Sequence, residues 1–263
     1  MARVLSALVL LPLVVGTVWF LPPVGTLALA TVASLLAFSE YVTIVSALEA
    51  RVPRMVIGVA VAAACISVGG GYLSAETILM SALIVIGALA VASGEPGIRV
   101  LRDSGASILP VVYLGLPLGA IAAIHGLAGR EAVLLLMLTI VISDSAQYYC
   151  GRAFGRRPLA PSISPKKTLE GAIGGLLFGT MAMTLGGVRV FPDAPLMLLV
   201  LVSASVAALG IVGDLFESLL KRSAGVKDSS SIIPGHGGVL DRIDSWLFAA
   251  PLYYSFVRYL HST

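Results

Sequence analysis

The sequence predicts an all-α, polytopic integral membrane protein with about nine transmembrane helices and a polar site that faces the cytoplasm. Three observations lead to this prediction. Of the 263 residues, 58% are hydrophobic and only 12% are charged, whereas a soluble domain carries about 25% charged residues. The mean hydropathy is +1.00. The charged residues gather in short islands between long apolar runs.

Nine apolar stretches follow one another, each close to the length of about 20 residues that a helix needs to cross a bilayer. Internal glycine and proline do not argue against them, because membrane helices tolerate both. The first stretch is expected to be retained, since no small-residue cleavage site follows at Leu21-Pro22-Pro23. The nine stretches are Val4 to Phe20, Val24 to Ser46, Met55 to Leu73, Thr77 to Ser93, Ser107 to Ile124, Ala132 to Cys150, Gly171 to Val190, Leu196 to Glu217 and Ile243 to Leu260.

The distribution of basic residues predicts the orientation, because loops rich in Lys and Arg face the cytoplasm. Nine spans would place the two termini on opposite sides of the membrane. With the N-terminus in the cytoplasm, only Arg130, Arg189 and Arg258 lie outside it. We therefore expect a multi-pass protein of the cell (inner) membrane, with the polar islands Gly151 to Glu170 and Ser218 to Arg242 in the cytoplasm. The basic residues on that side are 14 of the 17: Arg3, Arg51, Arg54, Arg99, Arg102, Arg152, Arg156, Arg157, Lys166, Lys167, Lys221, Arg222, Lys227 and Arg242.

Domain organisation is expected to be simple. No internal repeat and no soluble domain is visible, so we expect one membrane unit whose N-terminal helices (1–125) precede C-terminal helices with longer cytoplasmic loops (126–263). A net charge of +3 does not indicate nucleic-acid binding. The two cysteines, Cys65 and Cys150, do not predict a disulfide framework.

Carboxylates at membrane depth are the first candidates for chemistry. Asp144 lies near the end of the sixth stretch, Asp214 and Glu217 close the eighth, and Asp241 and Asp244 open the ninth. A charge at the bilayer centre costs about 2.5–3.5 kcal/mol on insertion scales, so such residues usually face a wet cavity or a partner. Glu217 is equally consistent with an ordinary charged helix end. Asp241 and Asp244 are three residues apart on one helical face, where two carboxylates suit a Mg²⁺ ion shared with phosphates.

The first polar island has the composition of an anion site. Ser164-Pro165-Lys166-Lys167-Thr168 precedes the seventh stretch, with Pro165 placed as at the start of a helix. Paired lysines and free backbone N–H groups at a helix N-terminus attract anions. The alternative is a plain positive-inside anchor that contacts lipid headgroups. The following Gly171-Ala-Ile-Gly-Gly segment indicates close helix packing rather than a phosphate loop.

The second polar island repeats this pattern. Lys221 and Arg222 follow the eighth stretch, and Lys227 comes five residues later. The run Pro234-Gly235-His236-Gly237-Gly238 cannot form a regular helix interior, and its glycines permit close approach of backbone to a ligand. His236 is a candidate for phosphate binding or proton transfer, or is merely a polar loop residue.

These residues together resemble the signature of the phosphatidate cytidylyltransferases, also called CDP-diacylglycerol synthases. Two shorter segments resemble the same family: Gly213 to Ser218, and Ser164 to Gly171. So does Asp144 with Tyr148 and the Gly151-Arg152-x-Phe154-Gly155 segment. Ser145, Gln147 and Arg156 depart mildly from the family pattern, in which Thr, Ala and Lys are expected at these positions. The residues that carry the main resemblance are Ser218, Leu220, Lys221, Arg222, Lys227, Asp228, Ser230, Ile233, Pro234, His236, Gly237, Gly238, Val239, Asp241, Arg242, Ile243 and Asp244.

The resemblance implies that CMP passes from CTP to phosphatidic acid, giving CDP-diacylglycerol and pyrophosphate in phospholipid biosynthesis. It implies Mg²⁺, with a second cation as an option, and the bilayer, CTP, phosphatidic acid and a homodimer as partners. The catalytic candidates are Asp144, Asp214, Asp241, Asp244 and Lys227, and the four aspartates are also the metal candidates. The substrate-binding candidates are Ser164, Lys166, Lys167, Thr168, Lys221, Arg222, Asp228, His236, Gly237, Gly238 and Arg242.

Two other classes of protein remain open. A CTP-dependent lipid-alcohol kinase would release CDP in place of pyrophosphate. A secondary transporter would carry charged residues near the midplane of matched, broken helices. The carboxylates of this sequence instead cluster at the predicted cytoplasmic ends of one half, which argues against transport.

Overall fold

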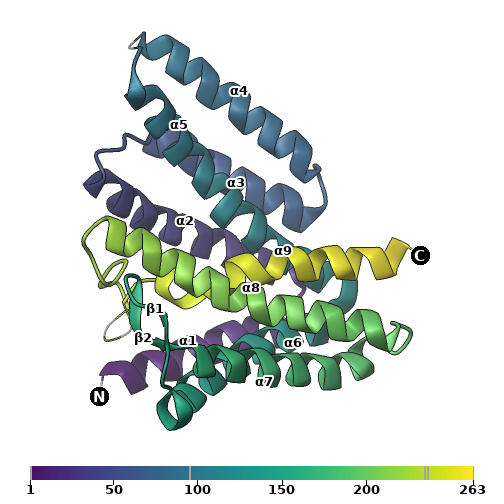
Figure 1. The fold of residues 1–263 in the computed structure, drawn as a ribbon. Coiled ribbons are helices and arrows are strands. Elements are labelled where there is room, and N and C mark those ends of the chain that lie inside the picture. Colours follow the sequence, from purple (N-terminus) through teal and green to yellow (C-terminus); the bar gives the residue numbers. More distant parts are fainter. Residues whose placement is uncertain (1, 95, 234, 236, 263) are drawn as a thin grey trace.

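The computed structural model describes residues 2–94, 96–233, 235 and 237–262, and it is a helical bundle with one small hairpin (Figure 1). The all-α expectation is therefore confirmed for the bundle. Over the described residues the elements are α1 (Ala2–Phe20), α2 (Pro23–Ala47), α3 (Arg54–Gly70), α4 (Ala75–Ser93), α5 (Ile98–Pro110), the π-helical turn η1 (Val111–Gly115), α6 (Leu116–Phe154), β1 (Pro158–Ala160), β2 (Ser164–Thr168), α7 (Leu169–Val190), α8 (Leu196–Ser223) and α9 (Leu240–Ser262).

The expected count of nine spans is wrong. Within the described residues, five helical segments are long and apolar enough to cross a membrane: Pro23–Ala47, Ala75–Ser93, Ile98–Phe154, Leu169–Val190 and Leu196–Ser223. Two further apolar helices, Leu8–Phe20 and Arg54–Gly70, are shorter than this criterion. The chain is thus a multi-pass membrane protein with fewer candidate spans than the hydropathy pattern predicts.

The fifth and sixth predicted stretches belong to one helical run of 57 residues, Ile98–Phe154. A straight helix of this length would measure about 85 Å, far more than the roughly 30 Å of a bilayer core. The run is interrupted at Gly129, whose φ of 78° and ψ of −179° are not helical. Glycine adopts such a positive φ without a steric penalty. The run also crosses the proposed boundary at residue 125, and the two-part division stays a prediction.

The ninth predicted stretch corresponds to α9, which does not qualify as a candidate span. Its first two turns carry Asp241, Arg242 and Asp244, and Arg258 lies near its end. These charges and several tyrosines lower its hydropathy below that of the neighbouring helices. Most of the helix is nevertheless packed inside the bundle, and Leu247, Ala250 and Tyr253 are each at most 2% exposed.

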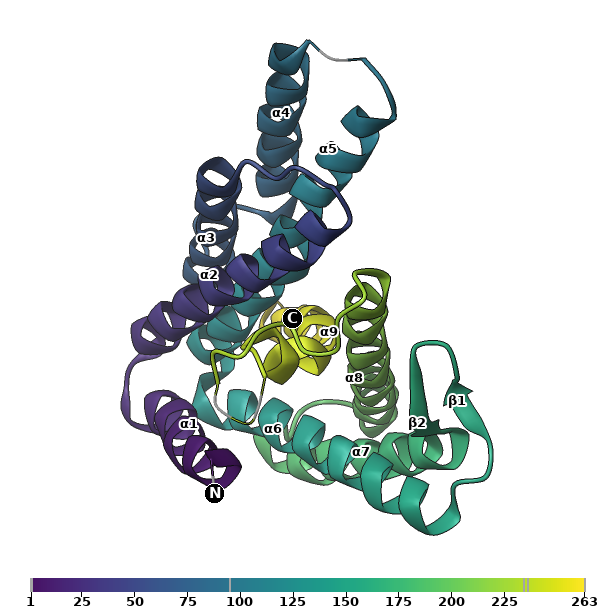
Figure 2. The same cartoon turned by 90° about the vertical axis from the view of Figure 1, so that its left-hand side faces the viewer.

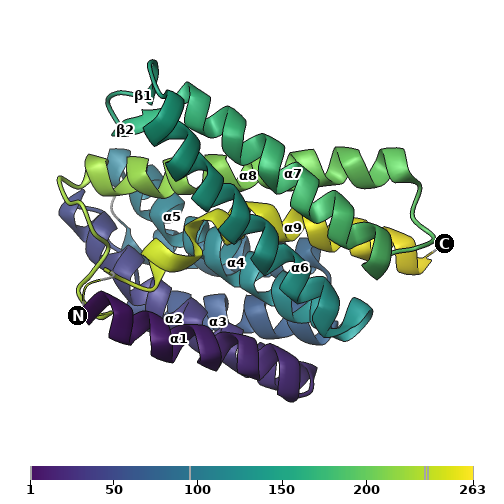
Figure 3. The same ribbon diagram turned by 90° about the horizontal axis from the view of Figure 1, so that it is seen from below.

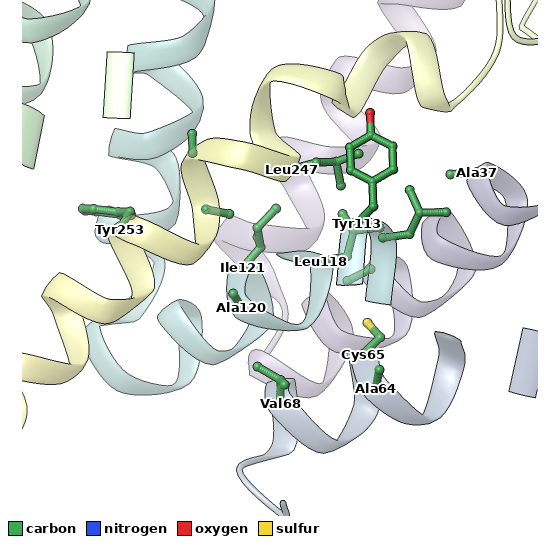
Figure 4. Close-up of a cluster of buried hydrophobic side chains, with 14 of the residues drawn as sticks. Ala37, Ala64, Cys65, Val68, Tyr113, Leu118, Ala120, Ile121, Leu247 and Tyr253 are labelled. Carbon is green, nitrogen blue, oxygen red and sulfur yellow. The ribbon is translucent and has the colours of Figure 1, made fainter. Parts of the chain in front are cut away.

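The core is built by α2, α3, α6 and α9, with α6 packed against both α3 and α9. Buried side chains from these elements interdigitate around Tyr113, which lies in the π-helical turn (Figure 4). The Tyr113 ring also makes edge contacts with Phe216 of α8 and Phe248 of α9, with centroids 5.2 and 6.1 Å apart. This core fixes the position of α9 relative to α8, and α9 lies between α2 and α8 (Figure 2).

The segment expected to open a helix at Pro165 forms a hairpin instead. β1 and β2 pair antiparallel, with Pro158 opposite Thr168 and Ala160 opposite Ser164. Helix α7 begins only at Leu169, because the Thr168 hydroxyl caps it by accepting a hydrogen bond from the Gly171 amide at 3.2 Å. The hairpin lies at the same end of the bundle as the start of α1, opposite the end of α9 (Figure 3).

Candidate active site

A hollow of about 700 Å³ lies at the end of the bundle that carries the hairpin. It is formed by the last turns of α6 and α8, the first turns of α7 and α9, strand β2 and the loop between α8 and α9. Its lining residues are Asp144, Gln147, Tyr148, Gly151, Arg152, Lys166, Lys167, Thr168, Gly171, Ala172, Asp214, Lys221, Asp228, Asp241, Arg242 and Asp244. We call this hollow the polar cavity.

The polar cavity brings together most of the residues singled out from the sequence. Five carboxylates and five cationic side chains line it, so opposite charges balance before any ligand enters. The predicted residues that line it are Asp144, Lys166, Lys167, Thr168, Asp214, Lys221, Asp228, Asp241, Arg242 and Asp244. These residues come from sequence positions up to 100 apart, and the fold alone places them around one space.

Other predicted residues lie near the polar cavity without lining it. Ser164 pairs with Ala160 in the hairpin. The Arg222 guanidinium donates to the carbonyls of Ile163 and Val226, at 3.2 and 3.1 Å, so it ties the loop to the hairpin. Lys227, Gly237 and Gly238 are also absent from the lining. His236 lies outside the described residues, so its predicted role is not addressed.

Glycines allow α6 and α7 to approach closely beside the polar cavity. A Cβ added to Gly175 would lie 2.3 Å from Gln147 Cγ and 2.9 Å from the Ser143 carbonyl oxygen. One added to Gly171 would lie 2.7 Å from the Gln147 carbonyl oxygen. Such distances leave no room for a side chain. The Gly171 segment therefore packs helices within the chain, as the sequence indicates.

An ion pair joins the hairpin to α8 across the polar cavity. The Lys167 ammonium contacts the Asp214 carboxylate, and the two side chains are 23% and 27% exposed. Lys167 lies on β2 and Asp214 lies on α8, so the pair holds the two polar islands together. Partial exposure keeps both groups within reach of a charged ligand.

A second, more buried group of charges centres on Lys221. Its ammonium contacts both the Glu217 carboxylate, one helical turn earlier, and Asp241 of α9. Glu217 is fully buried, so it is not the ordinary charged residue of a helix end that the sequence left open. Removing one partner of a buried ion pair costs about 3–5 kcal/mol, because a charge is left uncompensated. Lys221 therefore fixes the end of α8 against the start of α9.

Asp241 is held by hydrogen bonds as well as by Lys221. Its Oδ2 accepts from the Gly238 amide at 2.8 Å and from the Ser229 amide at 3.0 Å. Burial alone would raise the pKa of Asp241, but the hydrogen bond from Gly238 and the contact with Lys221 outweigh burial and lower this pKa to about 2. Asp241 is consequently ionised at neutral pH, and its oxygens already accept hydrogen bonds from groups of the protein.

The aspartates of the polar cavity suit a divalent cation of the Mg²⁺ type. Within the part of the chain that the structure describes, no three His, Cys, Asp or Glu side chains converge as a preformed metal site. Mg²⁺ is usually held by one or two carboxylates, with waters and substrate phosphates completing its shell. The donor set of the polar cavity fits that mode of binding, and the four predicted ligands stay a prediction.

Several residues of the site were not among the candidates from the sequence. Gln147, Tyr148 and Arg152 line the polar cavity, and the Gln147 amide donates to Asp144 at 3.0 Å. They lie one and two turns after Asp144 on α6, so helical periodicity could have found them. Glu40 of α2 was also missed, although it is the sole charged residue of the predicted second stretch. The signal that selected Asp144, a carboxylate at membrane depth, applies equally to Glu40.

Comparison with known proteins places the chain in a biochemical context. The profile described as "Cytidylyltransferase family" matches residues 1–260. A "Phosphatidate cytidylyltransferase 5, chloroplastic" of Arabidopsis thaliana is 46% identical over 143 residues, 51% of this chain and 33% of that protein.

Two bacterial relatives give the same context. The "Phosphatidate cytidylyltransferase" of Helicobacter pylori strain J99 is 41% identical over 144 residues, covering 55% of this chain and 53% of the relative. That of Haemophilus influenzae is 42% identical over 129 residues, covering 48% and 45%. The alignments thus span between a third and about half of the length of these relatives.

Proposed function

We propose that this chain, which belongs to the cytidylyltransferase family, transfers CMP from CTP to phosphatidic acid, giving CDP-diacylglycerol and pyrophosphate. The names of its relatives support this reaction. The observation that carries the proposal is the polar cavity, where five cations and five carboxylates meet at the end of a membrane bundle. A site of this composition suits two anionic substrates, one of them anchored in the bilayer.

The reaction is a displacement at phosphorus. An oxygen of the lipid phosphate forms a bond to the α-phosphorus of CTP, and the bond from that phosphorus to the bridging oxygen breaks. Pyrophosphate leaves with that electron pair. The lipid phosphate is already ionised, so no nucleophile from the protein is needed. The protein has to align the two groups and offset their negative charges.

The cations of the polar cavity are placed for that task. Lys166 and Lys167 extend from β2, and Arg152 and Arg242 extend from α6 and α9. We assign these four residues to the phosphates of CTP and of the lipid. Lys221 is already shared by Glu217 and Asp241, and its role is to hold α8 and α9 in place.

A divalent cation, when bound, would supply further charge neutralisation at the phosphates. Asp214 and Asp244 are the candidates best placed to hold it, with Asp144 beside them in the lining of the polar cavity. Asp241 serves as a structural anion because the Lys221 ammonium and the amides of Ser229 and Gly238 already reach it. A second cation remains an option within the proposal.

The orientation follows from the basic residues. Nine of the 17 lysines and arginines lie at the ends of α6 and α8, in and before the hairpin, in the loop after α8 and at the start of α9. We therefore place this end of the bundle in the cytoplasm of a cell membrane, where CTP is. The acyl chains of the lipid would stay in the bilayer. Nothing in the single chain supports the homodimer implied by the resemblance, and the proposal does not include it.

Product analysis tests the reaction. Purified protein in detergent receives CTP, Mg²⁺ and phosphatidic acid, with each component omitted in turn. The proposal predicts pyrophosphate only when all three are present, with an equal amount of a CDP-lipid. A parallel incubation with a lipid alcohol such as diacylglycerol in place of phosphatidic acid tests the kinase alternative, for which CDP and the phosphorylated alcohol would be the products. Absence of any product from folded protein would contradict the proposed function.

A further inference from the structure

Glu40 is a buried carboxylate that the proposed mechanism does not use. It lies on α2 in the N-terminal half of the chain, and it is 2% exposed. Burying an ionised carboxylate is costly unless it is well paired by hydrogen bonds. The partners of Glu40 therefore show what the residue does in the fold.

Both oxygens of Glu40 are occupied by one segment far away in the sequence. Oε1 accepts from the Ser230 hydroxyl at 2.7 Å and from the Val239 amide at 2.9 Å. Oε2 accepts from the Ser229 hydroxyl at 2.9 Å and from the Leu240 amide at 2.8 Å. The carboxylate thus binds both ends of the segment Ser229–Leu240, which contains the second part of the connection between α8 and α9 and the first residue of α9. We call this segment the Ser229–Leu240 loop.

Two of these donors belong to the start of α9. The first N–H groups of a helix have no partner within the helix, and they form the positive end of its dipole. Glu40 accepts from Val239, directly before the helix, and from Leu240, its first residue. A carboxylate from another helix therefore caps α9.

The fit between Glu40 and the loop is tight. A Cβ added to Gly238 would lie 2.1 Å from the Ser229 hydroxyl oxygen and 2.4 Å from Glu40 Oε2. Both distances are far below van der Waals contact. Position 238 therefore has to be glycine for the Glu40 carboxylate to reach the backbone of the loop.

The same contacts lead into the polar cavity. The Ser229 hydroxyl lies 2.9 Å from Glu40 Oε2 and 2.9 Å from Asp241 Oδ2. It has one hydrogen, so it donates to one carboxylate at a time. Asp241 in turn contacts Lys221. Ser229 thus links Glu40 to the cluster of Glu217, Lys221 and Asp241, which joins α8 to α9.

We propose that Glu40 is a positioning residue, which holds the Ser229–Leu240 loop and thereby sets the place of Asp241, Arg242 and Asp244 in the polar cavity. Its effect on turnover rests on the proposed function, whereas its effect on the loop does not. The first helices of the chain would then contribute to the site without touching a substrate.

The variant Glu40→Gln tests this role with little change in size. Both oxygens of Glu40 face donors, so the glutamine NH₂ must face two donors whichever way the amide turns. Glu40→Asp keeps both acceptors on a shorter side chain and should restore part of the effect. Tyr41→Phe is the matched control, because Tyr41 is the neighbouring buried residue and its hydroxyl donates to Ala106 rather than to the loop.

Hydrogen exchange of the intact protein, without substrate, measures the loop directly. Faster amide exchange over residues 229–240 in Glu40→Gln, with near wild-type exchange in Tyr41→Phe, is the expected result. Equal exchange in wild type and Glu40→Gln would overturn the proposal. This measurement stands even if the chain turns out to have a different activity.

Turnover is the second readout. We expect Glu40→Gln to lower kcat by about 10- to 100-fold, as loss of a supporting residue around a site commonly does, with partial recovery in Glu40→Asp. An unchanged kcat in a variant whose loop exchanges faster would also overturn the positioning role. A wild-type protein without cytidylyl transfer, but with the exchange pattern above, would refute the proposed function alone.

Discussion

At the scale of single residues, the polar cavity separates two kinds of charge. Lys167 and Asp214 are partly exposed and pair across the space that a ligand would enter. Glu217, Lys221 and Asp241 are more buried and are bound to one another. The first pair can exchange its partner for a phosphate or a metal, whereas the second group holds helices together.

Two lysines of the polar islands should therefore differ in their effect on catalysis. Lys167→Ala removes a cation from the polar cavity, and we expect kcat/KM for CTP to fall by about 100-fold, as for loss of one electrostatic donor. Lys227 is exposed and outside the lining, so Lys227→Ala should change kcat/KM by about twofold or less.

Steady-state pyrophosphate release by both variants measures this difference, and thermal unfolding in detergent checks that each is folded. A larger loss in Lys227→Ala than in Lys167→Ala would restore the catalytic role that the sequence predicted for Lys227. It would contradict the assignment of the phosphates to the cations that line the polar cavity.

At the scale of elements, the contact between α6 and α7 leaves little room for side chains on α7. Gly171, Gly174 and Gly175 place the backbone of α7 against α6, where added Cβ atoms would lie 2.3–2.7 Å from their nearest neighbours. Asp144 and Arg152 lie on this part of α6 and line the polar cavity. The close spacing of α6 and α7 thus fixes where the residues of α6 lie in the polar cavity.

Gly175→Ala should destabilise the protein by about 1–3 kcal/mol, because the new methyl group forces α6 and α7 apart. Gly87→Ala in α4 is the matched control, since nothing lies within 4 Å of a Cβ at that position. Thermal unfolding in one detergent compares the two variants. Equal stability would show that the interface between α6 and α7 adapts, against the tight packing described here.

The elements also show where sequence reasoning succeeded. The apolar runs predicted where most helices lie, because a run of about 20 apolar residues can be recognised in the sequence without knowledge of the fold. The hairpin was missed, because Pro165 suits the first turn of a helix and also an edge strand, and the pairing of Pro158 with Thr168 decides between them. The span count was wrong because the fifth and sixth stretches form one helical run, because Leu8–Phe20 and Arg54–Gly70 are short, and because α9 carries too many polar residues.

At the scale of the whole molecule, the charges of the two islands and the carboxylates of the neighbouring helix ends predicted which residues gather. Ten of the predicted residues line one cavity. The sequence signal that selected Asp144, a carboxylate at membrane depth, also applies to Glu40. Its partners could not be foreseen, because contacts between residues about 200 apart depend on α2 lying beside the start of α9.

The central claim is that the polar cavity is the place of cytidylyl transfer. The most direct test compares pyrophosphate release by Asp244→Asn and Asp193→Asn, two isosteric substitutions at opposite ends of the bundle, after thermal unfolding confirms that both are folded. Asp244 lines the polar cavity, whereas Asp193 lies in the exposed connection between α7 and α8. Release should fall by at least about 100-fold in Asp244→Asn and stay at the wild-type level in Asp193→Asn. Full activity of Asp244→Asn would show that cytidylyl transfer takes place elsewhere.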